Sequence, residues 1–194
     1  NEGLDTHPDT KEAADRSNPS GRHGGDIIGI VQRLSYIKEL GATTIWTTPL
    51  LEDNEPTYSY HGYAQSDLYK IDPRYGNNSW FKEMVLEAHR QGLKVIKDEV
   101  PNHWSSKHWM IQDLPTATWI HQFDQFTRSS YRTTTQFDPY ASKADQKASA
   151  DGWFDTTMPD MNQQNPLLLT YLIQNTIWWI EYAHLDGLRV DTYS

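Results

Sequence analysis

The sequence predicts a parallel α/β fold, and two observations support this prediction. A helical pattern followed by a short apolar strand occurs three times, within residues 26–50, 80–100 and 166–191. Long connections follow the first two predicted strands, and parallel sheets build their sites in such connections. A complete α/β barrel takes roughly 250 residues and eight strands. Because this chain has 194 residues, we expect it to be part of a barrel.

The first unit begins at Asp26, which we expect to be an N-cap. Apolar residues follow it at spacings of three and four as far as Leu40, and Gly41 ends the predicted helix. The run Ala42–Leu50 is apolar and β-branched, with a proline near its end. Such a run is typical of a buried parallel strand.

The second and third units repeat this order. Trp80–Arg90 is expected to be helical, and Leu93–Val100 is the strand that follows it. Pro166 occupies a first-turn position, Leu167–His184 has a dense apolar face, and Gly187–Asp191 is the last predicted strand. A doubly wound nucleotide fold lacks support, because neither a Gly-rich turn nor a P-loop follows any of these strands.

Two connections are long enough to hold functional elements. One runs from Pro49 to Pro73, and the other from Asn102 to about Asn165. The second shows little periodicity but contains many aromatic residues, namely Trp104, Trp109, Trp119, Phe123, Phe126, Phe137 and Trp153. Connections of this length in a compact domain are usually functional.

Composition excludes several classes of partner. The chain has 17 Lys and Arg against 26 Asp and Glu, a net charge of −9, so it repels nucleic acid and anionic membrane surfaces. No stretch reaches the length of about 18 apolar residues that membrane insertion needs. Without cysteine there is no thiolate nucleophile and no Cys-ligated zinc.

Polar side chains gather where the second predicted strand ends. Asp98, Asn102 and His103 would lie at the mouth of the sheet, where His103 could donate to a ligand hydroxyl. The alternative is that these side chains only satisfy loop amides. A zinc site of Asp98, His103 and His108 is a weaker alternative, because the spacing matches no helical ligand pair.

The last predicted strand holds the most specific pair. Side chains alternate along a strand, so Arg189 and Asp191 project to the same side. A neighbouring guanidinium favours the ionised carboxylate, which a nucleophile needs to attack an anomeric carbon. A structural ion pair at a strand end is the alternative.

The segment Tyr60–Tyr63 offers rings and an imidazole beside a glycine. Aromatic faces stack on the apolar faces of sugar rings, and Asp, Asn, His and Arg match sugar hydroxyls. Exposed tyrosines can equally cover the edge of a core.

Together these segments resemble the α-amylase family, glycoside hydrolase family thirteen. Asp98–His103 is similar to its D-x-V-x-N-H block, 158–162 to its M-P-D-L-N block, Gly187–Asp191 to its G-x-R-x-D block and Tyr60–Tyr63 to its Y-H-G-Y segment. The resemblance runs from about Gly24 to Ser194. Within the family, the chain most resembles neopullulanases and cyclomaltodextrinases.

The resemblance implies part of a (β/α)8 TIM barrel, about strands 2 to 4, with a B subdomain inserted after strand 3. The implied divisions are 1–103 for the first part of the catalytic barrel, 104–162 for the inserted B subdomain and 163–194 for the continuing barrel with helix 3 and strand 4.

The resemblance also assigns roles. It makes Asp191 the catalytic nucleophile and Arg189 the group that holds and ionises it. Asp98 would be structural at the barrel mouth. The expected substrate-binding residues are His61, Tyr63, Asn102 and His103, with Tyr63 stacking on the sugar and Asn102 mainly shaping the site.

Calcium is the one metal that the resemblance suggests, and no organic cofactor is expected. Asn1, Asp5, the carbonyl of Gly24 and Asp26 fall where ligands of the subgroup would be, and oxygen donors suit calcium. An Asp-capped helix after a polar loop is the alternative reading of Asp26, and Leu4 stands where a further oxygen ligand would be expected.

The implied activity is retaining hydrolysis of α-1,4 bonds, with α-1,6 bonds as a further option, in starch-derived oligosaccharides, cyclodextrins or pullulan. The family's general acid would lie beyond Ser194, so residues 1–194 alone are expected to be inactive. The alternatives are an α-glucanotransferase and a non-catalytic carbohydrate-binding relative. We expect a periplasmic or secreted location, or alternatively a cytoplasmic one, and the resemblance allows a homodimer of the full-length protein.

Overall fold

The computed structural model describes residues 24–55, 60–130 and 137–192, with Ser17, Pro19 and Thr135. The predicted calcium ligands Asn1 and Asp5 lie outside the described residues. The helices are α1 (Ile27–Gln32), α2 (Leu34–Glu39), α3 (Asn78–Arg90), α4 (Trp109–Gln112), η1 (Ala117–Trp119), α6 (Lys143–Ala150) and α7 (Pro166–Ala183). The strands are β1 (Thr44–Trp46), β2 (Leu51–Glu52), β3 (Asp67–Ile71), β4 (Lys94–Glu99) and β5 (Gly187–Val190).

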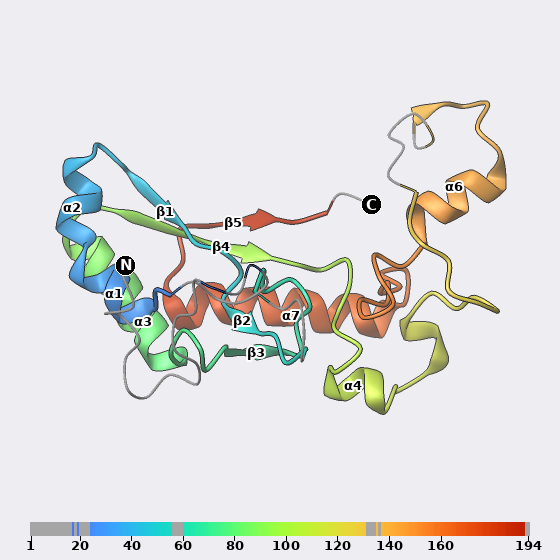
Figure 1. Cartoon of the computed structure of the whole chain (residues 1–194), viewed down its shortest axis with the longest axis horizontal. Coiled ribbons are helices and arrows are strands. Elements are labelled where there is room, and N and C mark those ends of the chain that lie inside the picture. Colours follow the sequence, from blue (N-terminus) through green and yellow to red (C-terminus); the bar gives the residue numbers. More distant parts are fainter. Residues whose placement is uncertain are drawn as a thin grey trace.

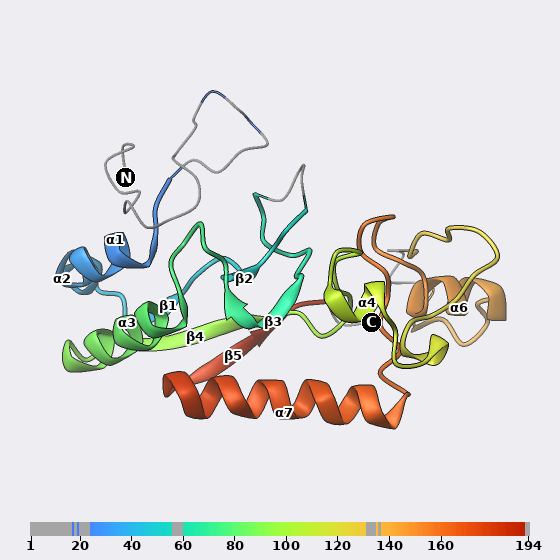
Figure 2. The ribbon, with the colours of Figure 1, turned by 90° about the horizontal axis from the view of Figure 1, so that it is seen from below.

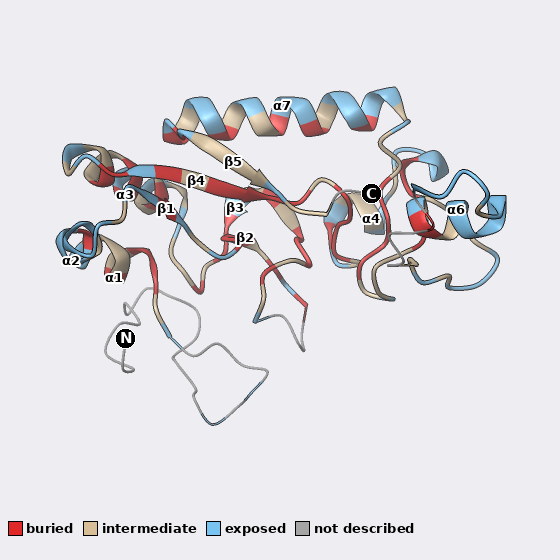
Figure 3. Cartoon of the chain, turned by 90° about the horizontal axis from the view of Figure 1, so that it is seen from above, coloured by how far each residue is buried: buried red, intermediate tan, exposed pale blue. Residues whose placement is uncertain are grey.

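The main sheet is parallel, as the sequence predicted, with the strand order β1-β4-β5. Helix α7 runs the length of the sheet, and α3 packs between α7 and α1 (Figures 1 and 2). Strand β4 is central and buried over most of its length (Figure 3). Because all three strands run the same way, their carboxyl ends meet at one edge of the sheet.

The third unit matches its prediction closely. Helix α7 begins at Pro166, and Asn165 caps it by accepting from the amides of Leu167 and Leu168 at 3.0 and 3.2 Å. The buried face of α7 includes Trp179, whose Nε1 donates to the Leu68 carbonyl at 2.7 Å. This bond fixes α7 against β3.

The first unit differs from its prediction. Asp26 is the N-cap, with Oδ1 accepting from the Gly29 amide at 2.7 Å. The single helix expected up to Leu40 is instead two helices, because Arg33 leaves helical geometry at φ −115° and ψ 8°. The strand expected over Ala42–Leu50 is only β1, and its Trp46 is 54% exposed.

The connection Pro49–Pro73 holds a second sheet that the sequence analysis missed. Strands β2 and β3 pair antiparallel, with Leu51 opposite Ile71. Strand β3 has five residues, of which Leu68 and Ile71 are buried, and β2 has two residues. Strands this short have too little periodicity to distinguish them from loop.

The inserted region after β4 lies at the end of the molecule opposite α1 and α2 (Figure 1). It contains α4, η1 and α6 and returns to the sheet through residues 158–162. His103 bridges Asp160, and Ile120 bridges Met161. This return places the 158–162 segment directly against the end of β4.

Candidate active site

The candidate site forms where β1, β4 and β5 end. Asp98 on β4 and Arg189 on β5 are register partners. Arg189 Nη1 donates to Asp98 Oδ1 at 3.3 Å and to Oδ2 at 3.0 Å. Trp46 on β1 donates from Nε1 to Asp98 Oδ2 at 3.0 Å, and the Arg189 guanidinium lies over its ring, 5.1 Å from the centroid. One side chain from each strand therefore meets at the buried carboxylate of Asp98.

Asp191 follows β5 and shares Arg189 with Asp98. Arg189 Nη1 donates to Asp191 Oδ1, so the two side chains lie on the same side as alternation predicted. Thr192 Oγ1 donates to Asp191 Oδ2 at 2.8 Å, and the Asp191 amide donates to the Glu99 carbonyl at 2.7 Å. Both the side chain and the backbone of Asp191 are thus held in place.

The charged groups of the site shift the pKa values of Asp98 and Tyr63. Burial raises the pKa of Asp98, and the nearby Asp191 raises it further, whereas the bonds from Trp46 and Arg189 lower it. The pKa of Tyr63 is raised by burial and then by Asp98 and Asp191, and Arg189 opposes this. Tyr63 therefore stays a neutral phenol at the edge of a carboxylate pair.

Tyr63 and His61 lie together on the loop that follows β2. The Tyr63 amide donates to His61 Nδ1 at 2.9 Å, and the two rings stack with centroids 5.8 Å apart. Gly62 makes this turn possible, since its φ is 77° and an added Cβ would lie 2.7 Å from the Pro49 carbonyl oxygen. The pairing presents a stacked aromatic face beside Arg189.

Asn102 and His103 lie after β4, between the sheet and the inserted region. His103 is 1% exposed and packs on Phe154 with ring centroids 5.1 Å apart. Burial lowers the pKa of His103 to about 4, against the opposing effect of Asp191. The Asn102 amide nitrogen lies 3.3 Å from His103 Nδ1. A neutral, oriented imidazole can hydrogen-bond to a sugar hydroxyl.

The zinc alternative fails. His108 Nδ1 accepts from the Met110 amide at 3.1 Å, and its ring stacks on Trp104 with centroids 4.2 Å apart. Across residues 24–55, 60–130 and 137–192, no three His, Cys, Asp or Glu side chains converge as metal ligands. Within the described residues, Asp98, His103 and His108 therefore do not form a metal site.

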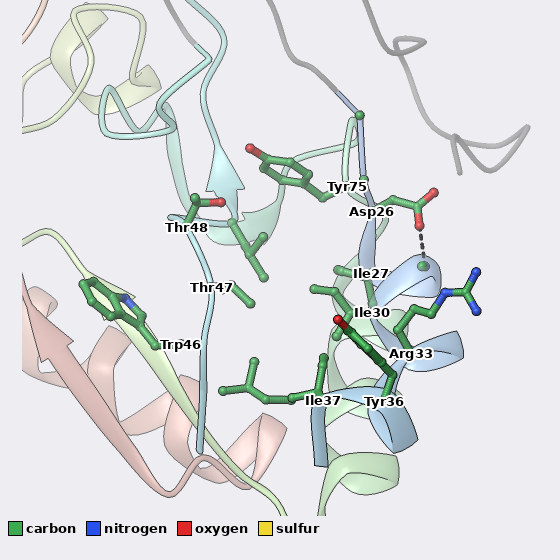
Figure 4. Close-up of a pocket in the computed structure, with 15 residues that line it drawn as sticks. Asp26, Ile27, Ile30, Arg33, Tyr36, Ile37, Trp46, Thr47, Thr48 and Tyr75 are labelled. Carbon is green, nitrogen blue, oxygen red and sulfur yellow. Dashed lines mark hydrogen bonds between the residues drawn. The ribbon is translucent and has the colours of Figure 1, made fainter. Parts of the chain in front are cut away.

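Gly24 and Asp26, the two described residues of the calcium prediction, line a pocket that extends to Trp46 at the end of β1. This cavity of about 680 Å³ lies between α1, α2 and β1, and it is lined mostly by apolar side chains such as Ile30, Ile37 and Ile45 (Figure 4). Asp26 is 4% exposed and caps α1. Its carboxylate and the Gly24 carbonyl are oxygen donors, the type that calcium takes.

Sequence reasoning missed two contributors to the site. Trp46 was treated only as part of the strand expected over Ala42–Leu50, and it lies at a strand end because β1 ends there. Asp160 was noted only as part of its sequence block. Its carboxylate is 2.6 Å from His121 Nδ1, and it also takes a hydrogen bond from the side chain of Asn102.

Comparisons with known proteins agree with this geometry. Residues 6–194 match the family model of the alpha amylase catalytic domain. The chain is 31% identical over 170 residues to a cyclomaltodextrinase of Thermoanaerobacter pseudethanolicus, covering 87% of this chain and 28% of that protein. It is 30% identical over 193 residues to neopullulanase 2 of Thermoactinomyces vulgaris, covering 95% and 30%.

A solved structure is similar as well. The alpha-amylase of Geobacillus thermoleovorans, complexed with acarbose, superposes with a TM-score of 0.74 at 36% identity, covering 91% of this chain and 36% of that one. The chain thus spans about a third of the length of the proteins it matches. By the extent of these matches, the chain belongs to the alpha-amylase family and forms part of its (β/α)8 catalytic barrel.

Proposed function

We propose that this chain is part of a retaining α-glucan hydrolase in which Asp191 is the nucleophile. The observation that supports this most directly is the position of the Arg189 guanidinium, which donates to both Asp98 and Asp191. Asp191 is the more exposed of the two carboxylates, at 16% against 0% for the Asp98 side chain, so it is the one that a substrate could reach. An ionised carboxylate at a strand end is what attack on an anomeric carbon needs.

The proposed reaction has two steps. An oxygen of Asp191 forms a bond to the anomeric carbon while the glycosidic bond breaks, and a second carboxylic acid protonates the leaving oxygen. Water then releases the sugar from Asp191 with the second group acting as base. The resemblance places that second group beyond Ser194, so residues 1–194 alone are proposed to be inactive.

Substrate contacts would come from the surrounding loops. Tyr63 would stack on the sugar ring, and His61 and His103 would hydrogen-bond its hydroxyls, while Asn102 orients His103. Asp98 would hold Arg189 in position at the strand ends and would not contact the sugar. Relatives named for cyclomaltodextrin and pullulan support α-1,4-linked oligosaccharides, cyclodextrins or pullulan as the substrate class, with α-1,6 bonds also within reach.

The test uses the full-length protein with starch, pullulan and cyclodextrin as substrates. Asp191→Asn keeps the shape but removes the nucleophile, and we expect reducing-sugar release to fall at least about a thousandfold. Asp113→Asn, on the loop after α4, is the matched control and should leave the rate unchanged. If wild type and Asp191→Asn are equally inert yet bind glucans, the protein is a carbohydrate-binding relative. Transfer to a sugar acceptor in place of hydrolysis would identify a glucanotransferase.

Further properties are proposed with this function. We propose calcium binding by Gly24 and Asp26 with Asn1 and Asp5, and no catalytic step uses the metal. Chelation should lower the melting temperature of the wild type but not of Asp26→Asn.

We also propose the division into 1–103, 104–162 and 163–194, a periplasmic or secreted location, and a homodimer of the full-length protein. Among the described residues, no helix has the length and apolarity to cross a membrane.

A further inference from the structure

His121 lies between two carboxylates in the inserted region. Its Nδ1 is 2.6 Å from Asp160 Oδ2, and its Nε2 is 3.7 Å from Asp151 Oδ1. The other charged group that faces the ring is Lys147, which pairs with Asp151 at 2.5 Å. An imidazole with a carboxylate on each nitrogen is arranged to hold a proton on both.

Through Asp160, His121 is connected to the candidate active site. Asp160 is 2% exposed, its backbone bridges His103, and its carboxylate takes a hydrogen bond from the Asn102 side chain. The next residue, Met161, donates its amide to the Asn102 carbonyl at 2.8 Å. The position of Asp160 therefore determines where Asn102 and His103 lie.

Through Asp151, His121 is connected to α6. Asp151 is the C-cap of α6, and Lys147 lies in the last turn of this helix. Trp153 Nε1 donates to the His121 carbonyl at 2.8 Å, so the segment after α6 also contacts His121. Thus one side chain joins α6 to the segment that holds Asn102.

The protonation of His121 controls how strong this connection is. The pKa of His121 is raised above its ordinary 6.5, first by the bond to Asp160 and then by Asp151, against burial and Lys147. Below the raised pKa the ring carries a charge that attracts both carboxylates, with a hydrogen bond to Asp160 and an ion pair to Asp151. As the pH rises through it, the ring keeps one proton and the contact with one carboxylate is lost.

We propose that protonated His121 is a positioning residue that braces the inserted region against Asn102 and His103 and so sets the affinity of the site for sugar. This inference rests on the proposed function for the identity of the ligand. Its consequence is that glucan affinity falls at alkaline pH although His121 touches no sugar.

The test measures the affinity of the full-length Asp191→Asn protein for a linear maltooligosaccharide by calorimetry between pH 6 and 9. We expect the dissociation constant to rise on the order of tenfold as His121 loses its charge, the effect of weakening one charge-assisted hydrogen bond. His121→Asn keeps a donor toward Asp160 but carries no charge. Burial raises the pKa of Asp160 to about 6, so above that range His121→Asn should bind with an affinity that no longer changes with pH.

Two neighbouring substitutions should move the transition in opposite directions. Asp151→Asn removes a charge that raises the pKa of His121, so the transition moves to lower pH. Lys147→Met removes a charge that lowers it, so the transition moves to higher pH. Because Lys147 is 59% exposed, we expect Lys147→Met to remain folded. A shift of the transition in this variant would therefore not be due to unfolding.

The inference is overturned if His121→Asn keeps the pH dependence of the wild type, or if neither neighbouring substitution moves the transition. If His121 had only a structural role, its replacement would weaken binding equally at every pH. The proposed function fails separately, when the reducing-sugar assay shows equal activity with and without the Asp191 carboxylate. Absence of any oligosaccharide binding would overturn both.

Discussion

Arg189 and Asp98 face each other across the parallel β4 and β5 strands, with Arg189 Nη1 3.0 Å from Asp98 Oδ2. The Asp98 carboxylate is wholly buried, whereas the Arg189 side chain is 34% exposed and also reaches Asp191. The hydrogen bonds to Asp98 thus hold the Arg189 guanidinium in a position where it also contacts Asp191. This arrangement makes Arg189 the cation that pairs with both carboxylates.

Replacing Arg189 by Met should therefore lower kcat/KM of the full-length protein at least about a hundredfold. Asp191 would then lose the cation that pairs with it and holds it in place, and the pKa of Asp98 would rise because Arg189 lowers it. Arg189→Lys should be less harmful, because it keeps the charge, but it loses the planar stacking on Trp46. Steady-state kinetics across pH 5 to 8 measure both effects.

Arg90→Met is the control for this substitution. Arg90 is 64% exposed and pairs with Glu87 on the surface of α3. Its loss should leave kcat/KM within about twofold, since exposed pairs contribute little. Equal activity of Arg189→Met and wild type would refute the role given to Arg189.

The helix-facing side of β4 contains a buried ion pair, Lys97 with Glu99 at 2.5 Å. Thr176 on α7 donates to Glu99 Oε1 at 3.2 Å. Lys97→Met should lower the free energy of unfolding by about 3 to 5 kcal/mol, because Glu99 would be left buried without its partner. The double substitution Lys97→Met with Glu99→Leu should recover most of that loss.

Chemical denaturation of the full-length protein measures these changes. Lys70→Met is the matched control, because Lys70 is 51% exposed and its pair with Glu52 should contribute at most about 1 kcal/mol. A double variant no more stable than Lys97→Met would show that the charges do not act as a pair.

His108 should make stability depend on pH. Burial lowers its pKa to about 4, against an ordinary value of 6.5. The unfolded chain therefore takes up a proton below pH 6.5 that the folded protein takes up only near 4. The associated stability is present above 6.5 and is lost as the pH falls toward 4, by about 3 kcal/mol.

His108→Asn keeps an acceptor for the Met110 amide but does not titrate, so the free energy of unfolding should vary less between pH 6.5 and 4 than in the wild type. His184→Asn is the control, because His184 is exposed and its φ of 58° suits Asn. Parallel stability curves for His108→Asn and wild type would contradict the prediction.

Local patterns predicted much of the fold and part of the site. Asp26 and Pro166 occupy the helix starts expected from them, because capping depends on atoms within three residues along the chain. Arg189 and Asp191 contact each other because alternation along a strand places them on one side. The break at Arg33 had no comparable signal, since Arg is a good helix former.

The sequence by itself therefore determined the helix and strand units, their parallel order and the carboxylate with its guanidinium. Only the tertiary structure decided that Trp46 donates to Asp98 and that His121 meets Asp160, partners 52 and 39 residues apart. Such contacts depend on strand register and on where a long insertion returns to the sheet. Periodicity along the chain does not encode either, because both arise from packing between segments that are distant in sequence.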